Sequence, residues 1–423
     1  MINRAPRYFL RDDRGNFSVM FALTLVPVLG LIGMGVDYSR TAKYKAVLDA
    51  IADSASLAAV TPAMLNSPDS VSVSTATTLF NAQSSTITGL GTITVGVTPV
   101  DNGLQRTVTV TYATTSKTLF GGFIGMSTVP ISGKSAATAS VAPNIDFYLM
   151  LDDSPSMAIP ATSAGIATMI ASTSSQPSSA QSCAFACHEG DANTPSFPSI
   201  DNYQIARNLG VTLRMDLVTQ AVSNLMSTAQ STATVTNATY RAAIYTFDTG
   251  FNNITNGIAS LSTAQAKANA NISLYEVAYQ NQNNDTFTDW TDNITAMNQA
   301  MPNPGSGTNQ KGDTPQEVLL IVTDGVEDQT VSGSRVQSLM NPSYCTTIKN
   351  RGIRIAVLYT QYLPLPSNAW YTQYIAPFQP NIGPNLQSCA SPGLYTMVST
   401  DGDISGAMVS LFNTALATAH LTQ

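Results

Sequence analysis

Asp152, Ser154 and Ser156 stand at alternate positions directly after a short apolar run, residues 145–151. Such a run predicts a strand buried on both faces, so one carboxylate and two hydroxyls would lie on the loop at its carboxyl end. Hard oxygen ligands of this kind suit Mg²⁺, which prefers one or two carboxylates together with water. Helix N-capping accounts for the same residue types, so a metal site needs support from elsewhere in the chain.

A second carboxylate, Asp324, follows another apolar run, residues 317–323, and precedes Gly325. Parallel strands bring their carboxyl ends to one edge of a sheet, and open α/β sheets bind ligands in the crevice outside those ends. We therefore expect Asp152 and Asp324 to lie side by side. We interpret two further acids, Asp153 and Asp248, as loop or capping carboxylates.

These segments resemble the metal-ion-dependent adhesion site of von Willebrand factor A domains, which combines Asp-x-Ser-x-Ser, a Thr before a helix and an Asp in Thr-Asp-Gly. The resemblance implies a centre for Mg²⁺ (or Mn²⁺) with an open position for an acidic side chain of a protein partner. Its predicted ligands are Asp152, Ser154, Ser156, Thr291 and Asp324. Thr291 is chosen for its spacing to Ala296 and Met297, Thr286 and Thr288 are alternatives, and Trp290 replaces the usual glycine.

The elements that must position these residues alternate along residues 144–423. Further strands are expected at 241–247, 353–359 and 394–398, and helices at 214–226, 336–350 and 404–419. This order predicts an α/β fold with a doubly wound, mainly parallel sheet of Rossmann-like topology, as the von Willebrand A resemblance also implies. Long insertions are expected near 158–206 and 360–393.

The N-terminal region predicts a membrane anchor. Residues 17–36 are uncharged and match the roughly 20 apolar residues that a bilayer requires. The run is longer than the apolar region of a cleaved signal peptide. Arginines before it favour a cytoplasmic N-terminus, residues 1–16, and a single-pass helix. Pro27 and the glycines at 30, 33 and 35 favour local bending of that helix over a dimer motif.

The helical pattern continues beyond the apolar run, with Tyr44, Val47, Leu48 and Ile51 on one face, until Pro62 ends it. A helix at 73–82 and strands at 92–97 and 107–112 are expected to follow. The two strands flank the turn residues 101–103, which predicts a hairpin. Residues 37–143 are therefore expected to form an extended helix and a small α+β module.

Residues 14–23, Arg-Gly-Asn-Phe-Ser-Val-Met-Phe-Ala-Leu, followed by Pro27 and Asp37, resemble the N-terminus of TadE/TadG-like proteins of bacterial tight-adherence (Flp) pilus systems. Pilin-like members have a Glu five residues after the Gly of their processing site. Counted from Gly15, that position is Met20 in this chain, which favours the TadG-like branch that keeps its anchor. The resemblance implies an inner-membrane assembly or adhesion protein, with its bulk periplasmic or extracellular and pilus assembly components as partners. A metal-free structural or pilin-like subunit is the alternative.

Composition and the remaining motifs exclude other classes. A net charge of -7 argues against a nucleic-acid partner, because phosphate binding needs a basic face. Only His188 and His420 could serve as histidine bases, and neither lies in a catalytic context. An Mg²⁺-dependent phosphohydrolase would want a second Asp where Ser154 stands, so we expect no enzyme.

Four cysteines, Cys183, Cys187, Cys345 and Cys389, are an even number in a chain that its anchor would export. Oxidising compartments favour disulfides, and four cysteines allow three pairings. We favour Cys183 with Cys187 and Cys345 with Cys389. A zinc site at Cys183, Cys187 and His188 is a lesser alternative.

Overall fold

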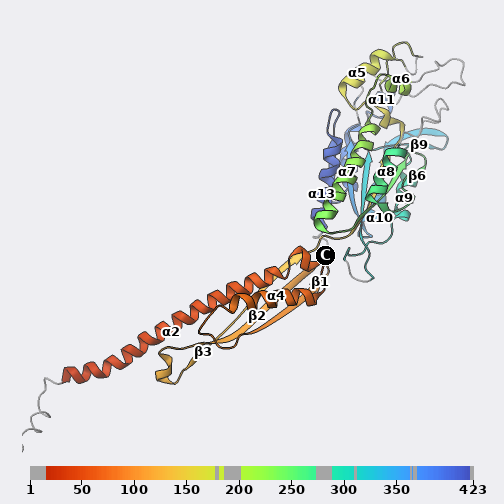
Figure 1. The fold of residues 1–423 in the computed structure, drawn as a ribbon. Helices are drawn as coiled ribbons and strands as arrows, with labels where there is room; N and C mark the ends of the chain where they lie inside the picture. Colours follow the sequence, from red (N-terminus) through yellow and green to blue (C-terminus); the bar gives the residue numbers. More distant parts are fainter. Residues whose placement is uncertain are drawn as a thin grey trace, which may run out of the picture. The chain divides into compact units, whose positions relative to one another are not determined.

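The computed structural model describes residues 16–176, 181–184, 202–272, 288–308, 312–362, 364 and 369–419. The chain divides into two compact units, Met1–Val141 and Ala142–Gln423. Figure 1 shows the elements of both units.

The first unit is a three-stranded antiparallel sheet packed on two helices. Its elements are α2 (Asn16–Ala58), α3 (Pro62–Leu65), α4 (Asp69–Ser84), β1 (Thr94–Asn102), β2 (Gln105–Lys117), η2 (Gly121–Ile124) and β3 (Thr128–Ser140), with strand order β1-β2-β3. The predicted hairpin is β1–β2. Strand β3 was not predicted, because its Ser, Ala and Thr residues give only weak apolar alternation.

Helix α2 has two parts that differ in the exposure of their side chains. Over residues 17–36 its side chains are exposed apart from Gly33, which is buried, and Gly30, which is half-buried. From Leu48 onward one face is buried against the sheet and α4, where Ala52 and Ala55 are fully covered. Among the described helices, α2 is long and apolar enough to cross a membrane, and it fits a single-pass anchor.

The second unit is an α/β domain. Its strands are β4 (Ile145–Asp152), β5 (Tyr240–Phe247), β6 (Phe251–Asn253), β7 (Ala259–Ser260), β8 (Gln316–Thr323), β9 (Val326–Val331), β10 (Ser334–Leu339), β11 (Arg354–Thr360) and β12 (Tyr395–Val398). Its helices are η3 (Pro155–Ala158), α5 (Ser163–Ser172), α6 (Asn202–Asn208), α7 (Arg214–Thr236), α8 (Leu261–Asn271), α9 (Trp290–Ala300), α10 (Ser343–Lys349), α11 (Ala369–Tyr374), α12 (Gln379–Cys389) and α13 (Ile404–Thr418).

The main sheet has the order β12-β11-β8-β4-β5-β6, and β7 pairs with β5. Strands β12, β11, β8, β4 and β5 run parallel, whereas β6 and β7 are antiparallel to β5. Helices α7, α8 and α13 contribute to the core on one face, and α9, α10 and α12 to the core on the other. The predicted doubly wound, mainly parallel α/β fold is confirmed.

The helix predicted over 336–350 is wrong in its first half. Residues of β10 instead pair with β9 in an antiparallel hairpin, and the helix is confined to α10. Ser332 and Gly333 form the two-residue turn with φ of 53° and 79°, the left-handed geometry that matches the twist of a tight hairpin. The Ser-Gly pair was the sequence signal for this turn.

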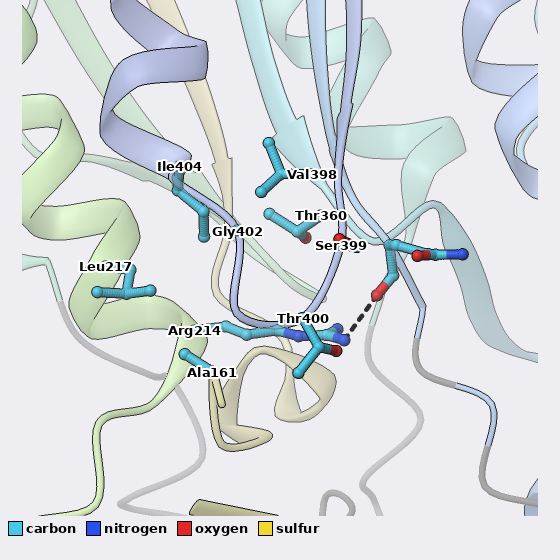
Figure 2. Close-up of a pocket in the computed structure, with 10 residues that line it drawn as sticks. Ala161, Arg214, Leu217, Thr360, Val398, Ser399, Thr400, Gly402 and Ile404 are labelled. Carbon is cyan, nitrogen blue, oxygen red and sulfur yellow. Dashed lines mark hydrogen bonds between the residues drawn. The ribbon is translucent and has the colours of Figure 1, made fainter. Parts of the chain in front are cut away.

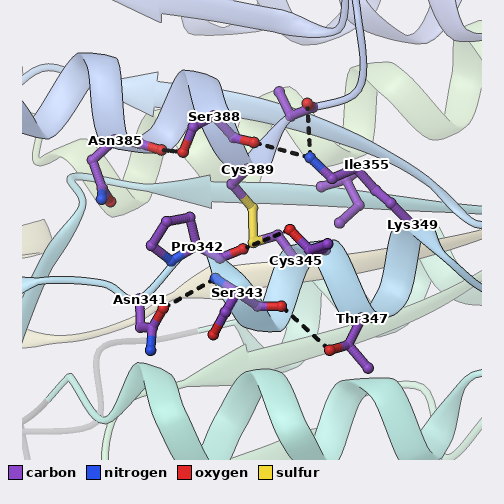
Figure 3. Close-up of a disulfide and its surroundings, with 12 residues drawn as sticks. Asn341, Pro342, Ser343, Cys345, Thr347, Lys349, Ile355, Asn385, Ser388 and Cys389 are labelled. Atoms are coloured by element: carbon purple, nitrogen blue, oxygen red, sulfur yellow. Dashed lines mark hydrogen bonds between the residues drawn. A yellow bond between two sulfur atoms is a disulfide. The ribbon is translucent and has the colours of Figure 1, made fainter.

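A disulfide joins helices α10 and α12 on one side of the domain (Figure 3). Cys345 and Cys389 are both fully buried, and their Cα atoms are 5.1 Å apart. Nearby, the Lys349 ammonium donates to the Ser388 carbonyl over 2.9 Å. Cys183 is also disulfide-bonded, and its pairing with Cys187 stays a prediction because Cys187 lies outside the described residues.

Candidate metal centre

Two buried carboxylates lie at the carboxyl ends of neighbouring parallel strands. Asp152 is the last residue of β4, and Asp324 directly follows β8. The pairing of Leu151 with Val322 brings the two strand ends to the same level, and both acids have no exposed surface. The next strand in the main sheet, β5, lies on one side of β4, and the later strand β8 lies on its other side. The carboxyl ends of β4 and β8 therefore lie at a topological switch point.

The loop after β4 brings two hydroxyls to the same place. The Asp152 Oδ1 atom accepts from the Ser154 backbone N–H over 3.1 Å, which curls the loop. The Ser154 and Ser156 hydroxyl oxygens are 3.1 Å apart. Ser154 occupies the N-cap position of η3, yet its side chain makes no capping hydrogen bond. The predicted capping role therefore does not occupy this hydroxyl.

Asp324 has spare ligand capacity. Its Oδ1 atom accepts a long hydrogen bond of 3.4 Å from Val326 N, while the buried Oδ2 atom has no hydrogen-bond partner. Gly325 makes the turn with φ of 82°, and a Cβ there would lie 2.5 Å from Ile382. Glycine is therefore required both by the backbone and by the close approach of α12.

Burial perturbs the pKa of both acids. Burial, and then the neighbouring Asp324 carboxylate, raises the pKa of Asp152 to about 7. Burial also raises the pKa of Asp324, which the Arg214 guanidinium and the Ser156 hydroxyl lower in part. The four predicted residues Asp152, Ser154, Ser156 and Asp324 thus converge, and a cation would relieve the cost of two buried negative charges.

Thr323 is a participant that sequence reasoning missed. Its hydroxyl donates to Asp152 Oδ2 over 2.6 Å and accepts from the Gly325 N–H over 2.9 Å. Thr323 is fully buried, so it fixes the orientation of the Asp152 carboxylate. Its position as the last strand residue before Asp324 was the signal that could have identified it.

Arg214 is the second residue that sequence reasoning missed. It begins α7, and its buried Nη1 atom lies 3.9 Å from Asp324 Oδ2 without a hydrogen bond. Its Nη2 atom donates to the Gln361 carbonyl over 2.6 Å (Figure 2). The side chain lines a small pocket with Thr360, Val398, Ser399, Thr400 and Gly402. A cationic side chain thus already stands beside the acids.

Thr291 lies at a different contact. It sits in the first turn of α9, and its hydroxyl donates to Glu327 Oε1 over 3.1 Å. Among the described residues, no side-chain hydrogen bond joins Thr291 to the other four predicted ligands. Of its alternatives, Thr288 forms a β-bridge with Asp328, and Thr286 lies outside the described residues.

Asp153 and Asp248 form a second acidic pair at the ends of β4 and β5. Burial and the neighbouring Asp248 raise the pKa of Asp153, and burial raises the pKa of Asp248 to about 6. The Asp248 Oδ1 atom accepts from Gly250 N over 2.6 Å, the loop role expected from the sequence.

The convergent set is chemically suited to a hard divalent cation. In the described part of the chain, no group of three or more Asp, Glu, His or Cys side chains could hold a metal ion. The centre at the ends of β4 and β8 has two carboxylates and two hydroxyls instead, a donor set that suits Mg²⁺ with water as the remaining ligand. The Asp324 Oδ2 atom, which accepts no hydrogen bond, is consistent with that use.

Comparisons with known proteins bear mainly on the N-terminal segment. Residues 15–63 match the family model described as Flp pilus-assembly TadE/G-like. No curated protein sequence matches the chain.

Similar solved structures include three pilus proteins. The vWF domain of the type V pili tip protein Mfa5 from Porphyromonas gingivalis is 9% identical, covering 67% of this chain and 98% of that one, with a TM-score of 0.37. The pilus adhesin SpaC from Lactobacillus rhamnosus GG is 12% identical over 77% of this chain, with a TM-score of 0.35, and this chain covers only 34% of it. The PilB minor pilin from Streptococcus sanguinis is 10% identical, covering 78% of each chain, with a TM-score of 0.34.

At these identities and TM-scores the solved structures carry no argument about function. The chain carries a TadE/G-like Flp pilus-assembly segment over residues 15–63, and an α/β domain with a mainly parallel sheet follows it.

Proposed function

We propose that this protein is a membrane-anchored assembly or adhesion component of a Flp (Tad) pilus system that binds a protein partner through a Mg²⁺-dependent site. The family match over residues 15–63 supports the pilus role, and helix α2 supports the anchor. In this proposal the N-terminus is cytoplasmic, the anchor lies in the inner membrane and the bulk is periplasmic or extracellular.

The observation that carries the metal site is the convergence of Asp152 and Asp324 at the switch point, where the buried Asp324 Oδ2 atom accepts no hydrogen bond. Asp152, Ser154, Ser156 and Asp324 would hold the ion, and Thr323 would orient Asp152. Thr291 remains a candidate fifth ligand. Mg²⁺ would supply an electrophilic position that an acidic side chain of a pilus component completes. We propose binding and not catalysis, because Ser154 occupies the place of a general acid.

Titration of the full chain in detergent micelles with Mg²⁺ and Mn²⁺ tests the site. We expect saturable binding heat that Asp152→Asn abolishes. Asp146→Asn is the matched control, since Asp146 lies near the start of the same strand and pairs with Arg241. Its variant should bind the cation as the original chain does. Absence of binding heat in the original chain, or its persistence in Asp152→Asn, would show that the metal site is wrong.

A second candidate function is a metal-free structural or pilin-like subunit of the same system. The Arg214 guanidinium favours it, because a cation 3.9 Å from Asp324 already offsets part of the acidic charge. Piliation that is lost on deletion of residues 17–36 but kept in Asp152→Asn would support this function over the first.

A further inference from the structure

The loop between β2 and β3, residues 118–127, is uncharged and exposes large apolar side chains; we call it the apolar loop. Its exposed members are Leu119, Phe120, Phe123, Ile124 and Met126, and Phe123 is 89% exposed. A contiguous exposed set of this kind marks an interaction site, because its contact with water is unfavourable.

The apolar loop has a defined backbone structure. The Thr118 hydroxyl donates to the Met126 carbonyl over 2.7 Å, and Met126 N donates to Gly121 O over 2.9 Å. Gly125 ends the short helix η2 in the left-handed conformation, with φ of 80°. The backbone polar groups are thus turned inward, and the apolar side chains are turned outward.

Asp37 of α2 fixes this loop to the helix. Its carboxylate accepts from the backbone N–H groups of Leu119, Phe120 and Gly121 over 2.7, 2.9 and 2.8 Å. Three charge-assisted hydrogen bonds to consecutive amides define both the position and the direction of the loop. Asp37 is itself buried by this contact.

Gly33, one helical turn earlier, is covered by the same loop. A Cβ at Gly33 would lie 2.5 Å from the Phe120 Cβ atom, so the absence of a side chain lets the loop close on the helix. Gly33 is the one buried residue in the described apolar run 17–36. The apolar loop therefore overlaps the end of the run along the helix.

The depth of the loop follows from helix geometry. Asp37 is the first charge after the apolar run, and Gly33 lies about 6 Å before it at 1.5 Å per residue. Segments that lie in the interface of a bilayer bury their apolar side chains about 5–10 Å into the boundary between headgroups and acyl chains. Tyr38 directly follows Asp37 in the helix, and Lys117 lies two residues before Leu119, which binds Asp37. Both side chains are exposed and of types suited to that layer.

We propose that the apolar loop inserts into the lipid bilayer beside α2, as a second membrane contact of the first unit. The proposal rests on α2 being a membrane anchor and is independent of the metal centre. The exposed apolar surface of residues 17–36 is continuous with the loop through Gly33 and Phe120, which is why lipid is the occupant. Two attachment points would hold the sheet at a fixed level above the membrane.

Site-specific fluorescence tests this insertion in the full chain reconstituted into phosphatidylcholine and phosphatidylglycerol vesicles. Phe123→Cys is labelled with the environment-sensitive fluorophore NBD; the described native cysteines are disulfide-bonded and do not react. We expect a blue-shifted emission that is lost when doxyl-labelled lipid is included and that aqueous iodide does not quench.

Two further labelled variants are the controls. Val100→Cys is the negative control, because Val100 is 58% exposed near the opposite end of the same sheet, and iodide should quench it. Val26→Cys is the positive control within the apolar run, where the side chain is 73% exposed and lipid should quench it. Phe123→Ser combined with Ile124→Ser should abolish lipid quenching of a label at Met126→Cys without loss of helical circular dichroism.

Each outcome has one meaning. Lipid quenching at positions 26 and 123 supports the proposal. Lipid quenching at 26 with iodide quenching at 123 overturns it and leaves the anchor intact. Protection of 123 from both quenchers also overturns it, in favour of a protein partner or a second copy. Iodide quenching at both positions overturns the anchor together with the loop insertion.

Discussion

Arg214→Gln is expected to destabilise the domain when divalent cations are absent. The Arg214 Nη1 atom and Asp324 Oδ2 are 3.9 Å apart, and both side chains are buried. At an effective dielectric constant of about 20, this separation corresponds to about 4 kcal/mol of attraction. Removing one partner of a buried ion pair costs about 3–5 kcal/mol, because the other charge stays buried without compensation. Glutamine also loses the hydrogen bond to Gln361 O, which adds about 1 kcal/mol.

Added Mg²⁺ should reverse much of this loss if the ion binds the same carboxylates. Removal of the guanidinium removes a competing positive charge, so Arg214→Gln should bind Mg²⁺ at least about tenfold more tightly, a difference of about 1.4 kcal/mol. Saturation to about 100 times the dissociation constant then adds about 2.7 kcal/mol to the free energy of unfolding.

Urea unfolding of the full chain in micelles, followed by tryptophan fluorescence with chelator and with Mg²⁺, measures these changes. Both tryptophans, Trp290 and Trp370, belong to the second unit, so the signal reports on this domain. Arg354→Gln is the matched control: Arg354 is buried, donates to the Ala415 carbonyl and forms no ion pair with a described residue. Its destabilisation should not depend on Mg²⁺.

A double-mutant cycle with Asp324→Asn decides whether charge is the cause. The two substitutions should show a coupling of about 1–3 kcal/mol in chelator. Equal destabilisation by Arg214→Gln in the presence and absence of Asp324, and with or without Mg²⁺, would refute the electrostatic reasoning and leave Arg214 as a packing residue.

Two further predictions concern pH and the disulfide. Burial is the main cause that raises the pKa of Asp152 to about 7 and that of Glu317 to about 8. The folded state therefore binds more protons than the unfolded chain from about pH 5 to 8, and the free energy of unfolding in chelator should fall as pH rises across this range. Urea unfolding that showed an increase would contradict this prediction. Cys345 and Cys389 are separated by 44 residues, so replacing both with Ala should lower the free energy of unfolding by about 4 kcal/mol. Dithiothreitol should lower it by at least as much in the original chain, because it also reduces the disulfide of Cys183. No change in either measurement would contradict this.

The sheet and four of the centre's residues were predictable because each strand carries its signal locally. Apolar runs that end in Asp152 and Asp324 specify both a buried strand and the position of a carboxylate at its carboxyl end. Parallel pairing then brings the two ends together, so no long-range information beyond fold class is needed. Ser154 and Ser156 follow from their spacing to Asp152 alone.

Arg214, Gly33 and the role of Asp37 could not be predicted, because each depends on a partner distant in sequence. The contact of Arg214 with Asp324 joins the start of α7 to the end of β8, and that of Asp37 joins α2 to a loop more than 80 residues later. The sequence predicts that the glycines bend the anchor, whereas in the structure Gly33 makes room for Phe120.

These long-range contacts share one physical property that points to function. Arg214 and Asp37 are buried charged side chains in a chain with only 11% charged residues. Arg214 lies beside Asp324 of the proposed metal site, and Asp37 binds the apolar loop of the proposed membrane contact. Burial of a charge is costly unless it is paired and hydrogen-bonded, so each of these residues depends on the positions of its partners. Arg214 therefore offsets part of the negative charge of the acids at the switch point. Asp37 fixes the position of the loop by which, in our proposal, the first unit contacts the membrane.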